Sequence, residues 1–428
     1  MKTFTASERQ LERAERVIPL GSQTFSKSRT QYPVGVSPLY AERADGCRLW
    51  DVDGNEYIDC VMSLAAVTLG YRHPVVTEAV KRQLDVGVVF TLPHRLEAEV
   101  AELICEMVPC AEQVRFGKNG TDATSAAVRL SRAFTGRERI ATCGYHGWQD
   151  WYIGSTARHL GVPQAVRELT HPFPYNDLDA LKALFAAHPG EFAAVVMEPM
   201  GGTEPRPGYL QSVKDFLRAQ GALLVFDETI TGFRFANGGA QAHFGVTPDL
   251  ATFGKGLANG FPLSAVTGRA DVMAKMQDVF FSGTFGGEAL SLAAAKATLT
   301  LLQREPVLAT IATRGQVLKD GVQALIDRHG LAGWLAISGH PAWTFLTLKD
   351  TPQASAFEIK TLLMQEQHQR GVLGLGTHNL SLAHGESDIA AVLAMYAEVL
   401  PRIGEALAAG GVKPYLRCEP LVPLFKVR

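Results

Sequence analysis

Short apolar runs that end abruptly in polar or glycine residues organise the middle of the chain. Two such runs, LLVF at residues 223–226 and LATF at residues 250–253, lead directly into Asp227 and into Gly254-Lys255-Gly256. Runs of this kind are typical of strands in a buried parallel sheet, whose carboxyl ends open into a ligand crevice. The pattern therefore predicts two strands that present a carboxylate and a lysine to one pocket.

The same pattern extends along the chain and predicts alternating strands and helices. Asp53-Gly54 marks a hairpin turn between two alternating runs. Further strands are predicted at residues 114–116, 139–143, 193–197, 262–267, 279–281, 343–348 and 371–375. Helices are predicted at residues 7–17, 75–84, 95–108, 121–136, 178–188, 209–220 and 289–302. This order of elements favours an α/β fold.

Length and composition narrow the class of protein. The 428 residues favour two domains, and a net charge of −2 offers no basic surface for nucleic acid. No apolar run approaches the length of a membrane span, and the N-terminus lacks the apolar core of a signal peptide. The six cysteines are scattered without metal-ligand spacing. We therefore expect a cytoplasmic protein with reduced thiols, no metal, and no nucleic-acid or membrane partner.

The lysine and the carboxylate suggest a specific chemistry. The Lys255 amine can form a Schiff base with an aldehyde, and the glycines on both sides of it leave room for a planar ligand. In pyridoxal phosphate (PLP) enzymes an acidic residue such as Asp227 also keeps the pyridine nitrogen protonated. Taken alone, either residue is more often a plain surface lysine or a helix-capping aspartate. That alternative is weakened here because both residues follow apolar runs and a phosphate-type loop lies upstream.

A candidate phosphate site lies upstream. A short predicted strand ends at residue 116, and a polar glycine turn then leads into a helix that starts near Gly120 and Thr121. Backbone amides at a helix N-terminus, with a hydroxyl beside them, can bind an anion. An ordinary helix cap is the alternative, and the spacing is not that of a P-loop.

Two motifs carry a resemblance to a known family. ETITGFR follows Asp227 at residues 228–234, and FGKGLANGFP occupies residues 253–262. In these motifs the chain resembles the class III aminotransferases of PLP fold type I, and it is most similar to the branch that contains glutamate-1-semialdehyde 2,1-aminomutase. The resemblance extends from about Pro19 to Leu400.

The resemblance implies an α/β fold in two domains. A large PLP-binding domain, residues 61–305, would hold a mostly parallel central sheet flanked by helices. A smaller α+β domain would come from both chain ends, residues 1–60 and 306–428. The family also implies a homodimer with its active sites at the subunit interface.

The resemblance further implies roles for single residues. Lys255 would form the Schiff base with PLP, and Asp227 would hold the pyridine nitrogen. The remaining cofactor contacts would be Gly120 and Thr121 on the phosphate, Tyr145 and Thr229 on the two ring faces, and Thr284 reaching the phosphate of the other subunit. Supporting positions would be His146, Glu198 and Glu228, and candidates to meet the substrate are Ser26, Lys27, Arg29 and Thr203.

The reaction expected from the family is transamination. An amino-acid donor would leave its amino group on the cofactor as pyridoxamine phosphate, and an aldehyde or ketone acceptor would then take it. The chain departs from the aminomutase pattern by lacking an aromatic residue near Ser63, by Thr203 in place of an asparagine, and by GGEA at residues 286–289. Intramolecular amine transfer, as in the aminomutase, is the alternative. A racemase or a non-catalytic binding protein on the same fold is expected less.

Overall fold

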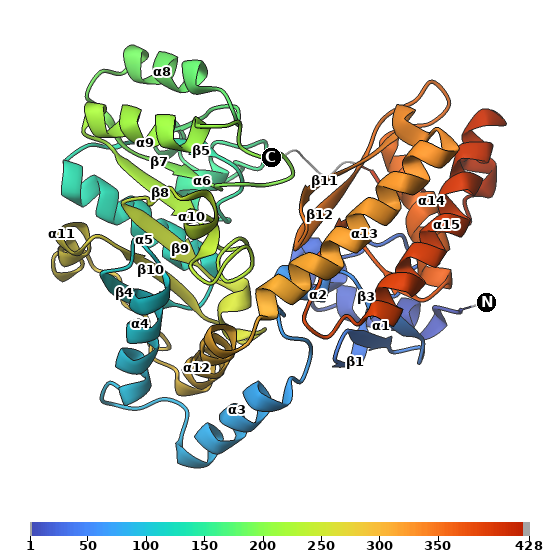
Figure 1. The fold of residues 1–428 in the computed structure, drawn as a ribbon, viewed down its shortest axis with the longest axis horizontal. Helices are drawn as coiled ribbons and strands as arrows, with labels where there is room; N and C mark the ends of the chain where they lie inside the picture. The colour runs from blue at the N-terminus through green and yellow to red at the C-terminus, as the bar shows by residue number, and fades with distance from the viewer. Residues whose placement is uncertain (1, 423–428) are drawn as a thin grey trace. The chain divides into compact units, whose positions relative to one another are not determined.

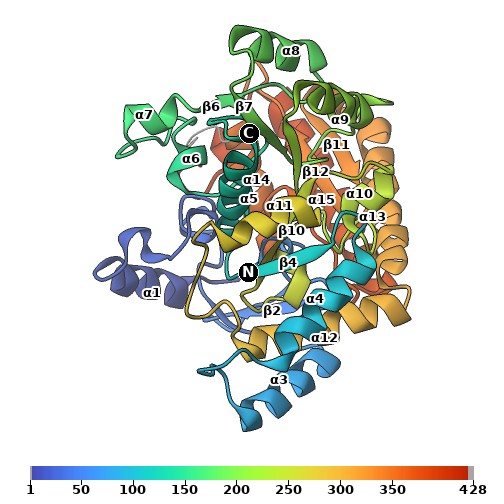
Figure 2. The same ribbon diagram turned by 90° about the vertical axis from the view of Figure 1, so that its left-hand side faces the viewer.

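The computed structural model describes residues 2–422, which separate into two units. One unit combines the chain up to His73 with the segment that begins at Ala309, and the other runs from Pro74 to Leu308. Figures 1 and 2 show the elements of each unit.

The unit from Pro74 to Leu308 is built on a seven-stranded sheet. Only β10 runs antiparallel to its neighbours, and the other described strands of the sheet share one direction. In spatial order the strands are β4 (Gln113–Gly117), β10 (Ser264–Gly268), β9 (Leu250–Phe253), β8 (Leu223–Asp227), β7 (Phe192–Met197), β5 (Arg139–Cys143) and β6 (Thr170–Pro172). The expected mostly parallel sheet and α/β fold are therefore confirmed.

Both faces of this sheet are covered by helices. On one face α5 (Gly120–Thr135) packs Ala127 and Leu130 against Val225 of β8. On the other face α8 (Leu178–Ala187) and α9 (Tyr209–Gln220) pack against Phe226. Burial on both faces explains why these strands are apolar runs rather than alternating ones.

The alternation of side chains along β8 and β9 places polar groups on the α5 face. Val225 belongs to the apolar cluster on that face, so Asp227, two residues later, points the same way. Leu250 of β9 also belongs to this cluster, and Thr252 follows at the same spacing. Because Asp227 and Thr252 are register partners in the parallel pair, their side chains lie together.

The same unit contains further helices. α5 ends at Gly136, whose φ of 68° is the left-handed C-cap that glycine favours. The remaining helices of the unit are α3 (Pro74–Val86), α4 (Arg95–Met107), α6 (Asp150–Ile153), α7 (Gln164–Arg167), α10 (Gly239–Phe244), α11 (Ala270–Met273) and α12 (Ala289–Arg304), with short 3-10 turns at Lys255–Ala258 and Ala274–Gln277. α13 (Val307–His329) contains the boundary between the units.

The other unit contains two small sheets. The first has the order β1 (Ala41–Asp45), β2 (Arg48–Asp51), β3 (Glu56–Asp59) and β13 (Val372–Leu373), and the second has the order β11 (Leu335–His340), β12 (Trp343–Leu348) and β14 (Thr377–His378). β2 and β3 form the hairpin predicted around Asp53-Gly54. The helices and 3-10 turns are α1 (Thr5–Glu15), α2 (Met62–Ala65), α14 (Ala356–Gln369), α15 (Glu386–Ala408), and the turns Pro19–Gly21, Phe25–Lys27, Leu331–Gly333 and Lys413–Tyr415.

The short element α2 is a left-handed turn. All four of its residues, none of them glycine, have φ between 44° and 67°. Such backbone costs roughly 1–2 kcal/mol per residue and persists only where the surroundings hold it. Here the buried Asp59 carboxylate accepts the amides of Val61 and Met62, and the Asn379 side chain donates to the Val61 carbonyl.

One predicted strand is absent. Residues 279–281 were expected to form a strand because they are apolar, but they form an irregular segment. Phe280 is 83% exposed, and the carbonyls of Phe280 and Phe281 accept hydrogen bonds from the guanidinium groups of Arg129 and Arg115. The prediction failed because an apolar run does not reveal whether its residues are buried.

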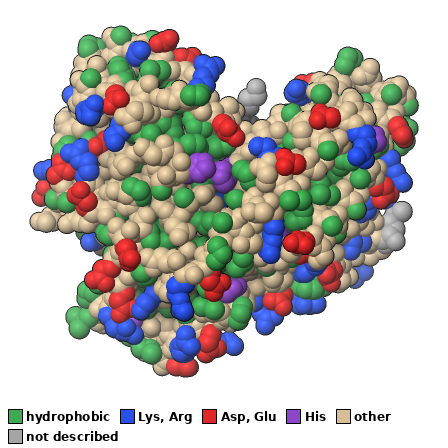
Figure 3. Space-filling model, in the orientation of Figure 1, with side chains coloured by type: hydrophobic (Ala, Val, Ile, Leu, Met, Phe, Trp, Pro, Cys, Tyr) green, Lys and Arg blue, Asp and Glu red, His purple; other side chains and the backbone are tan. Residues whose placement is uncertain are grey.

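Two observations concern possible nucleic-acid and membrane partners: the distribution of surface charge and the polarity of the helices. On the face that Figure 3 shows, acidic and basic side chains are interspersed. Among residues 2–422, every helix is either too short or too polar to pass through a lipid bilayer.

Candidate active site

Asp227 lies at the end of β8 with its carboxylate buried and hydrogen-bonded at both oxygens. The side chain is 4% exposed. Its Oδ1 accepts the Thr229 hydroxyl at 2.6 Å and the Thr252 hydroxyl at 3.1 Å, as well as the Thr229 amide at 3.1 Å. Its Oδ2 lies 2.8 Å from Nδ1 of His146. A carboxylate with several donors is held in one orientation, which suits a group that must meet a ligand atom.

His146 sets the charge of this carboxylate. Burial alone would raise the pKa of Asp227, but the hydrogen bond and charge of His146, with the bonds from Thr229, hold it below its usual value. The imidazole is itself buried, and it stacks on Trp151 with ring centroids 6.2 Å apart. The pair therefore presents an ionised carboxylate at the edge of the sheet.

The neighbouring Glu228 has a different environment. It is fully buried and accepts the amides of Ala240 and Gln241, the Gln241 side-chain amide at 3.0 Å and the Thr231 hydroxyl at 3.0 Å. Burial raises its pKa, because these donors compensate the charge only in part. Glu228 thus connects β8 to α10.

The N-terminus of α5 forms a possible anion site. Asp122 turns back and accepts the amides of Lys118 and Asn119 at 3.0 and 2.8 Å. The helix begins at Gly120, and the first amides of a helix have no acceptor within it. The Thr121 hydroxyl is buried and has no hydrogen-bond partner among the described residues. Amides and a hydroxyl that await an acceptor are the groups that bind a phosphate.

Lys255 follows β9 in a strained backbone. Its φ of 41° is rare for a residue with a side chain, and such outliers gather at functional sites. A Cβ at Gly254 would lie 3.3 Å from the Thr229 methyl group and 3.7 Å from Cα of Gly120. The residue before Lys255 therefore touches both the residue that bonds Asp227 and the start of α5. The site residues predicted from two strands and one helix lie side by side.

Tyr145 lies in the loop after β5. Its ring is 37% exposed and meets Tyr152 edge-on at 5.7 Å, so it is not a core aromatic. Its amide donates to the Glu198 carboxylate at 3.1 Å. The glycines on either side of Tyr145-His146 have positive φ, and a Cβ on either would clash, at Gly144 with Glu198 and at Gly147 with Thr121. The loop is thus pressed against the α5 N-terminus, with Glu198 supporting it.

Thr284 lies in an exposed turn before α12. An ion pair of 3.1 Å between Lys118 and Glu288 connects this turn to the loop that precedes α5. Glu288 also caps α12 by accepting the amides of Leu290 and Ser291. The turn that carries Thr284 is therefore tied to the candidate phosphate site of the same chain.

The substrate candidates lie at exposed positions in both units. Thr203 follows β7 in the unit that holds the sheet. Ser26, Lys27 and Arg29 belong to the other unit. There the Arg29 guanidinium forms an ion pair with Glu15 at 2.5 Å, and the Lys27 amine donates to the Ser63 hydroxyl at 3.3 Å. An anion that bound Arg29 would have to compete with Glu15.

Some site residues were missed from the sequence. Thr252 bonds Asp227, and Lys118 and Glu288 anchor the turn of Thr284. A lone hydroxyl inside a fully buried apolar strand is a signal that could have identified Thr252. No local pattern pairs Lys118 with Glu288, which are 170 residues apart.

The arrangement fits PLP. The buried unpartnered Thr121 hydroxyl and the start of α5 suit its phosphate, and the ionised Asp227 suits a protonated ring nitrogen. Glycines at positions 120, 144 and 147 lie closer to neighbouring side chains than a residue with a Cβ could. Lys255 supplies the amine.

Comparisons with known proteins agree with this fit. Residues 31–382 match the family model of the class III aminotransferases. The chain is 32% identical over 406 residues to a 3-aminobutyryl-CoA aminotransferase of Cloacimonas acidaminovorans (strain Evry), covering 92% of this chain and 97% of that protein. The PLP internal aldimine form of the FumI protein of Sphingopyxis sp. MTA144 is 32% identical, with a TM-score of 0.88 over 96% of this chain and 99% of that one.

Two further structures, an aminotransferase and an aminomutase, differ in how similar their sequences are to this chain. A β-phenylalanine aminotransferase of Variovorax paradoxus is 30% identical, with a TM-score of 0.83 over 94% of this chain and 95% of that one. A glutamate-1-semialdehyde aminomutase of Pseudomonas aeruginosa PAO1 is 23% identical, with a TM-score of 0.81 over 92% and 94%, and so shares the fold at greater distance. The more similar relatives are aminotransferases. The chain belongs to the class III aminotransferases, and its reaction is PLP-dependent transamination.

Proposed function

We propose that this aminotransferase takes an amino substrate whose amine lies away from the α-position of a free amino acid. The proposal rests on two relatives at 30–32% identity, an aminotransferase of 3-aminobutyryl-CoA and one of β-phenylalanine. Both of these compounds carry a β-amine. The departures from the aminomutase pattern, among them Thr203 and the GGEA segment at residues 286–289, support a substrate other than glutamate-1-semialdehyde.

The proposed roles follow from the contacts of each residue. PLP, when bound, supplies an electron sink that stabilises negative charge on the substrate carbon. Asp227, kept ionised by His146, would hold a proton on the ring nitrogen. The Lys255 amine would bind the cofactor and then carry a proton between the two carbons that exchange it. Thr229, fixed by its bonds to Asp227, and Tyr145 would bracket the ring.

Phosphate binding would combine both subunits of a homodimer. Gly120 and Thr121 would bind from one subunit, and the partner subunit's Thr284 would bind from the other. Exposed apolar side chains support a subunit interface near this turn: Leu92 is 75%, Phe280 83% and Phe285 58% exposed. The chain near Leu92 meets the chain that follows Phe285, since the amide of Ala289 donates to the Val88 carbonyl at 2.9 Å. Sedimentation analysis of the wild type and of Phe280→Asp tests the dimer.

The cysteines support a cytoplasmic location, which we also propose. All six are free. Burial raises the pKa of the Cys110 and Cys143 thiols to about 12, so these two stay protonated and unreactive at neutral pH.

The test follows the absorbance of the bound cofactor while single amines are added. We expect β-phenylalanine to change the spectrum at concentrations at which α-phenylalanine does not, and added pyruvate or 2-oxoglutarate to restore it. Lys255→Ala is the matched control, and its spectrum should show no restoration. If 4,5-diaminovalerate alone changed the spectrum, intramolecular transfer would replace the proposal. If α-amino acids were the better donors, the proposed substrate class would be wrong.

A further inference from the structure

A second lysine of this chain lies in an apolar cavity far along the sequence from Lys255. The cavity has a volume of about 210 Å³ and lies between α14, β12 and the segment at residues 375–376. Lys360 of α14 lines it. Its apolar walls are Leu346, Leu348, Phe357, Leu363, Met364 and Leu375. All of these residues belong to the unit that begins again at Ala309.

Helix geometry explains why Lys360 lines this space together with apolar residues. Lys360, Leu363, Met364 and Gln367 are spaced by three and four residues, so they form one stripe of α14. Gln367 is already committed, because its side-chain amide donates to the Gly374 carbonyl at 2.6 Å. Among the residues that line the cavity, Lys360 is the only titratable one.

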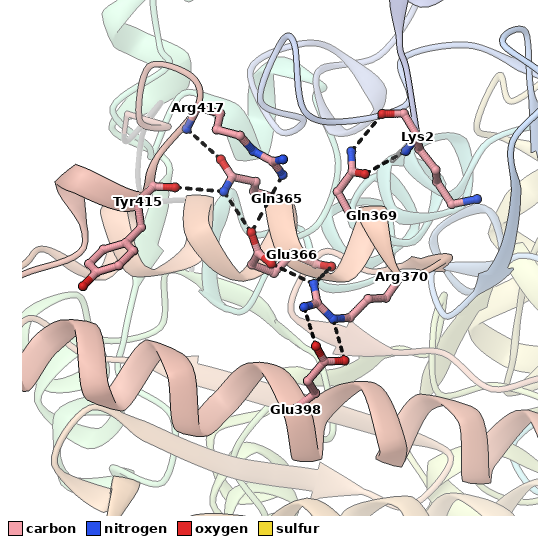
Figure 4. A network of polar contacts seen from close by, with 8 residues as sticks. All are labelled: Lys2, Gln365, Glu366, Gln369, Arg370, Glu398, Tyr415 and Arg417. Atoms are coloured by element: carbon pink, nitrogen blue, oxygen red, sulfur yellow. Dashed lines mark hydrogen bonds and ion pairs between the residues drawn. The ribbon is translucent and has the colours of Figure 1, made fainter.

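The carboxylates of α14 are engaged with other cations. Figure 4 shows the network around Glu366, which pairs with Arg370 at 2.7 Å and with Arg417 at 3.8 Å. Arg370 also makes a two-pronged contact with Glu398 of α15. Glu358, at the start of α14, pairs with Lys413 at 3.3 Å.

Lys360 has no such partner. No hydrogen bond or ion pair of its amine exists within residues 2–422. The Lys360 side chain is half-buried, and this burial without a compensating charge lowers the pKa of the amine. Each unit of such a shift raises the uncharged, nucleophilic fraction at neutral pH about tenfold.

We propose that Lys360 is a second reactive lysine, distinct from Lys255, which condenses with short apolar aldehydes inside this cavity. The amine nitrogen attacks the carbonyl carbon, the carbonyl oxygen leaves as water with the two amine protons, and a carbon–nitrogen double bond forms without any change of oxidation state. A neutral imine suits a cavity that offers no counter-ion. The volume holds roughly seven groups the size of a water molecule, which limits the aldehyde to a few carbons.

The test uses the PLP-loaded protein, in which Lys255 is occupied. Butanal is added with cyanoborohydride, which reduces the imine, and the alkylated lysines are located by peptide mass mapping. Lys349, an exposed lysine of the same unit, is the internal reference. At pH 7 we expect Lys360 to react faster than Lys349, because more of its amine is uncharged. Equal rates at the two lysines would overturn the proposal.

The pH profile gives a second readout. The rate at Lys360 should level off once its amine is deprotonated, whereas an exposed amine gains about tenfold per pH unit up to pH 9 or beyond. Parallel profiles would show that the amine is charged and solvated, which contradicts the proposal. Protection of Lys360 by butyrate would contradict it too, because the cavity would then bind a carboxylate to a charged amine.

Two variants distinguish the contribution of the cavity from that of the Lys360 amine. Ala356→Leu narrows the same cavity and keeps the amine, so it should slow labelling by butanal several-fold and leave labelling by formaldehyde unchanged. Lys360→Met removes the label while keeping the length of the side chain, and it should be as stable as the wild type or more so. If Ala356→Leu left butanal labelling unchanged, reaction outside the cavity would replace the proposal.

Discussion

Two adjacent carboxylates at the end of β8 have opposite environments. Asp227 and Glu228 are both buried, at 4% and 0% exposure, and burial raises the pKa of each as the largest single effect. The pKa of Asp227 is nevertheless lowered, and that of Glu228 is raised. The difference lies in the partners, because a basic ring and two hydroxyls meet Asp227, whereas amides and a hydroxyl meet Glu228.

The comparison separates a carboxylate whose charge serves chemistry from one whose hydrogen bonds serve the fold. Neutral donors satisfy the hydrogen-bonding capacity of a carboxylate but offset only part of its desolvation. A basic ring adds an opposite charge that keeps the neighbouring carboxylate ionised. We therefore predict that changes at Asp227 alter activity and that changes at Glu228 alter stability.

The largest expected effect is that of Asp227→Asn. The variant keeps the shape of the side chain and removes its charge, so the cofactor nitrogen would lose its proton. We expect kcat/KM to fall about 10³-fold, which corresponds to about 4 kcal/mol of transition-state stabilisation. Steady-state kinetics with the donor identified by the absorbance titration measures this loss. A loss of less than about threefold would show that Asp227 does not hold the ring.

Glu228→Ala tests the prediction that changes at Glu228 alter stability. The substitution leaves the amides of Ala240 and Gln241 and the Thr231 hydroxyl without an acceptor inside the protein. We expect the free energy of unfolding to fall by about 3 kcal/mol, measured by urea denaturation. The kcat of the folded fraction should stay within about twofold of the wild type. Lost activity at unchanged stability would reverse the assignment.

The pH dependence of stability tests the direction of the pKa shift of Glu228. A carboxyl whose pKa is raised by folding stabilises the protein fully below its unfolded pKa of about 4.3, and this contribution declines as pH rises through the folded value. Because the pKa of Glu228 is raised, the wild type should lose stability relative to Glu228→Gln as pH rises above about 4.3. The slope is at most about 1.4 kcal/mol per pH unit. Urea denaturation of both proteins between pH 5 and pH 8 measures it. An opposite slope would mean that the fold favours the charged form.

The fold and the candidate site differ in how far the sequence could predict them. Strands β8 and β9 were predictable because burial on both faces makes their residues uniformly apolar, and the hairpin at Asp53-Gly54 because its turn chemistry is local. The segment at residues 279–281 was not, since its apolar residues are exposed.

Contacts that depend on strand register or on distant chain segments could not be predicted from the sequence. Thr252 meets Asp227 only because β8 and β9 pair in one particular register, 25 residues apart in the chain. The unpaired amine of Lys360 depends on where Arg370, Arg417 and Lys413 find their partners. The residue roles that the family resemblance supplied stay predictions until variants test them.

The smallest and most closely matched test deletes one hydroxyl from each carboxylate. Thr252→Val removes a donor from Asp227, and Thr231→Val removes a donor from Glu228, while valine keeps the shape of each side chain. Both threonines are buried, at 0% and 1% exposure, so each loss should cost about 1 kcal/mol. For Thr231→Val this cost should appear in the free energy of unfolding, with kcat unchanged. For Thr252→Val we expect, in addition, a fall in kcat of about fivefold, because one bond that orients the Asp227 carboxylate is gone. Equal kcat values for the two variants would mean that the Thr252 hydroxyl stabilises the strand pair alone, and that His146 and Thr229 suffice to orient Asp227.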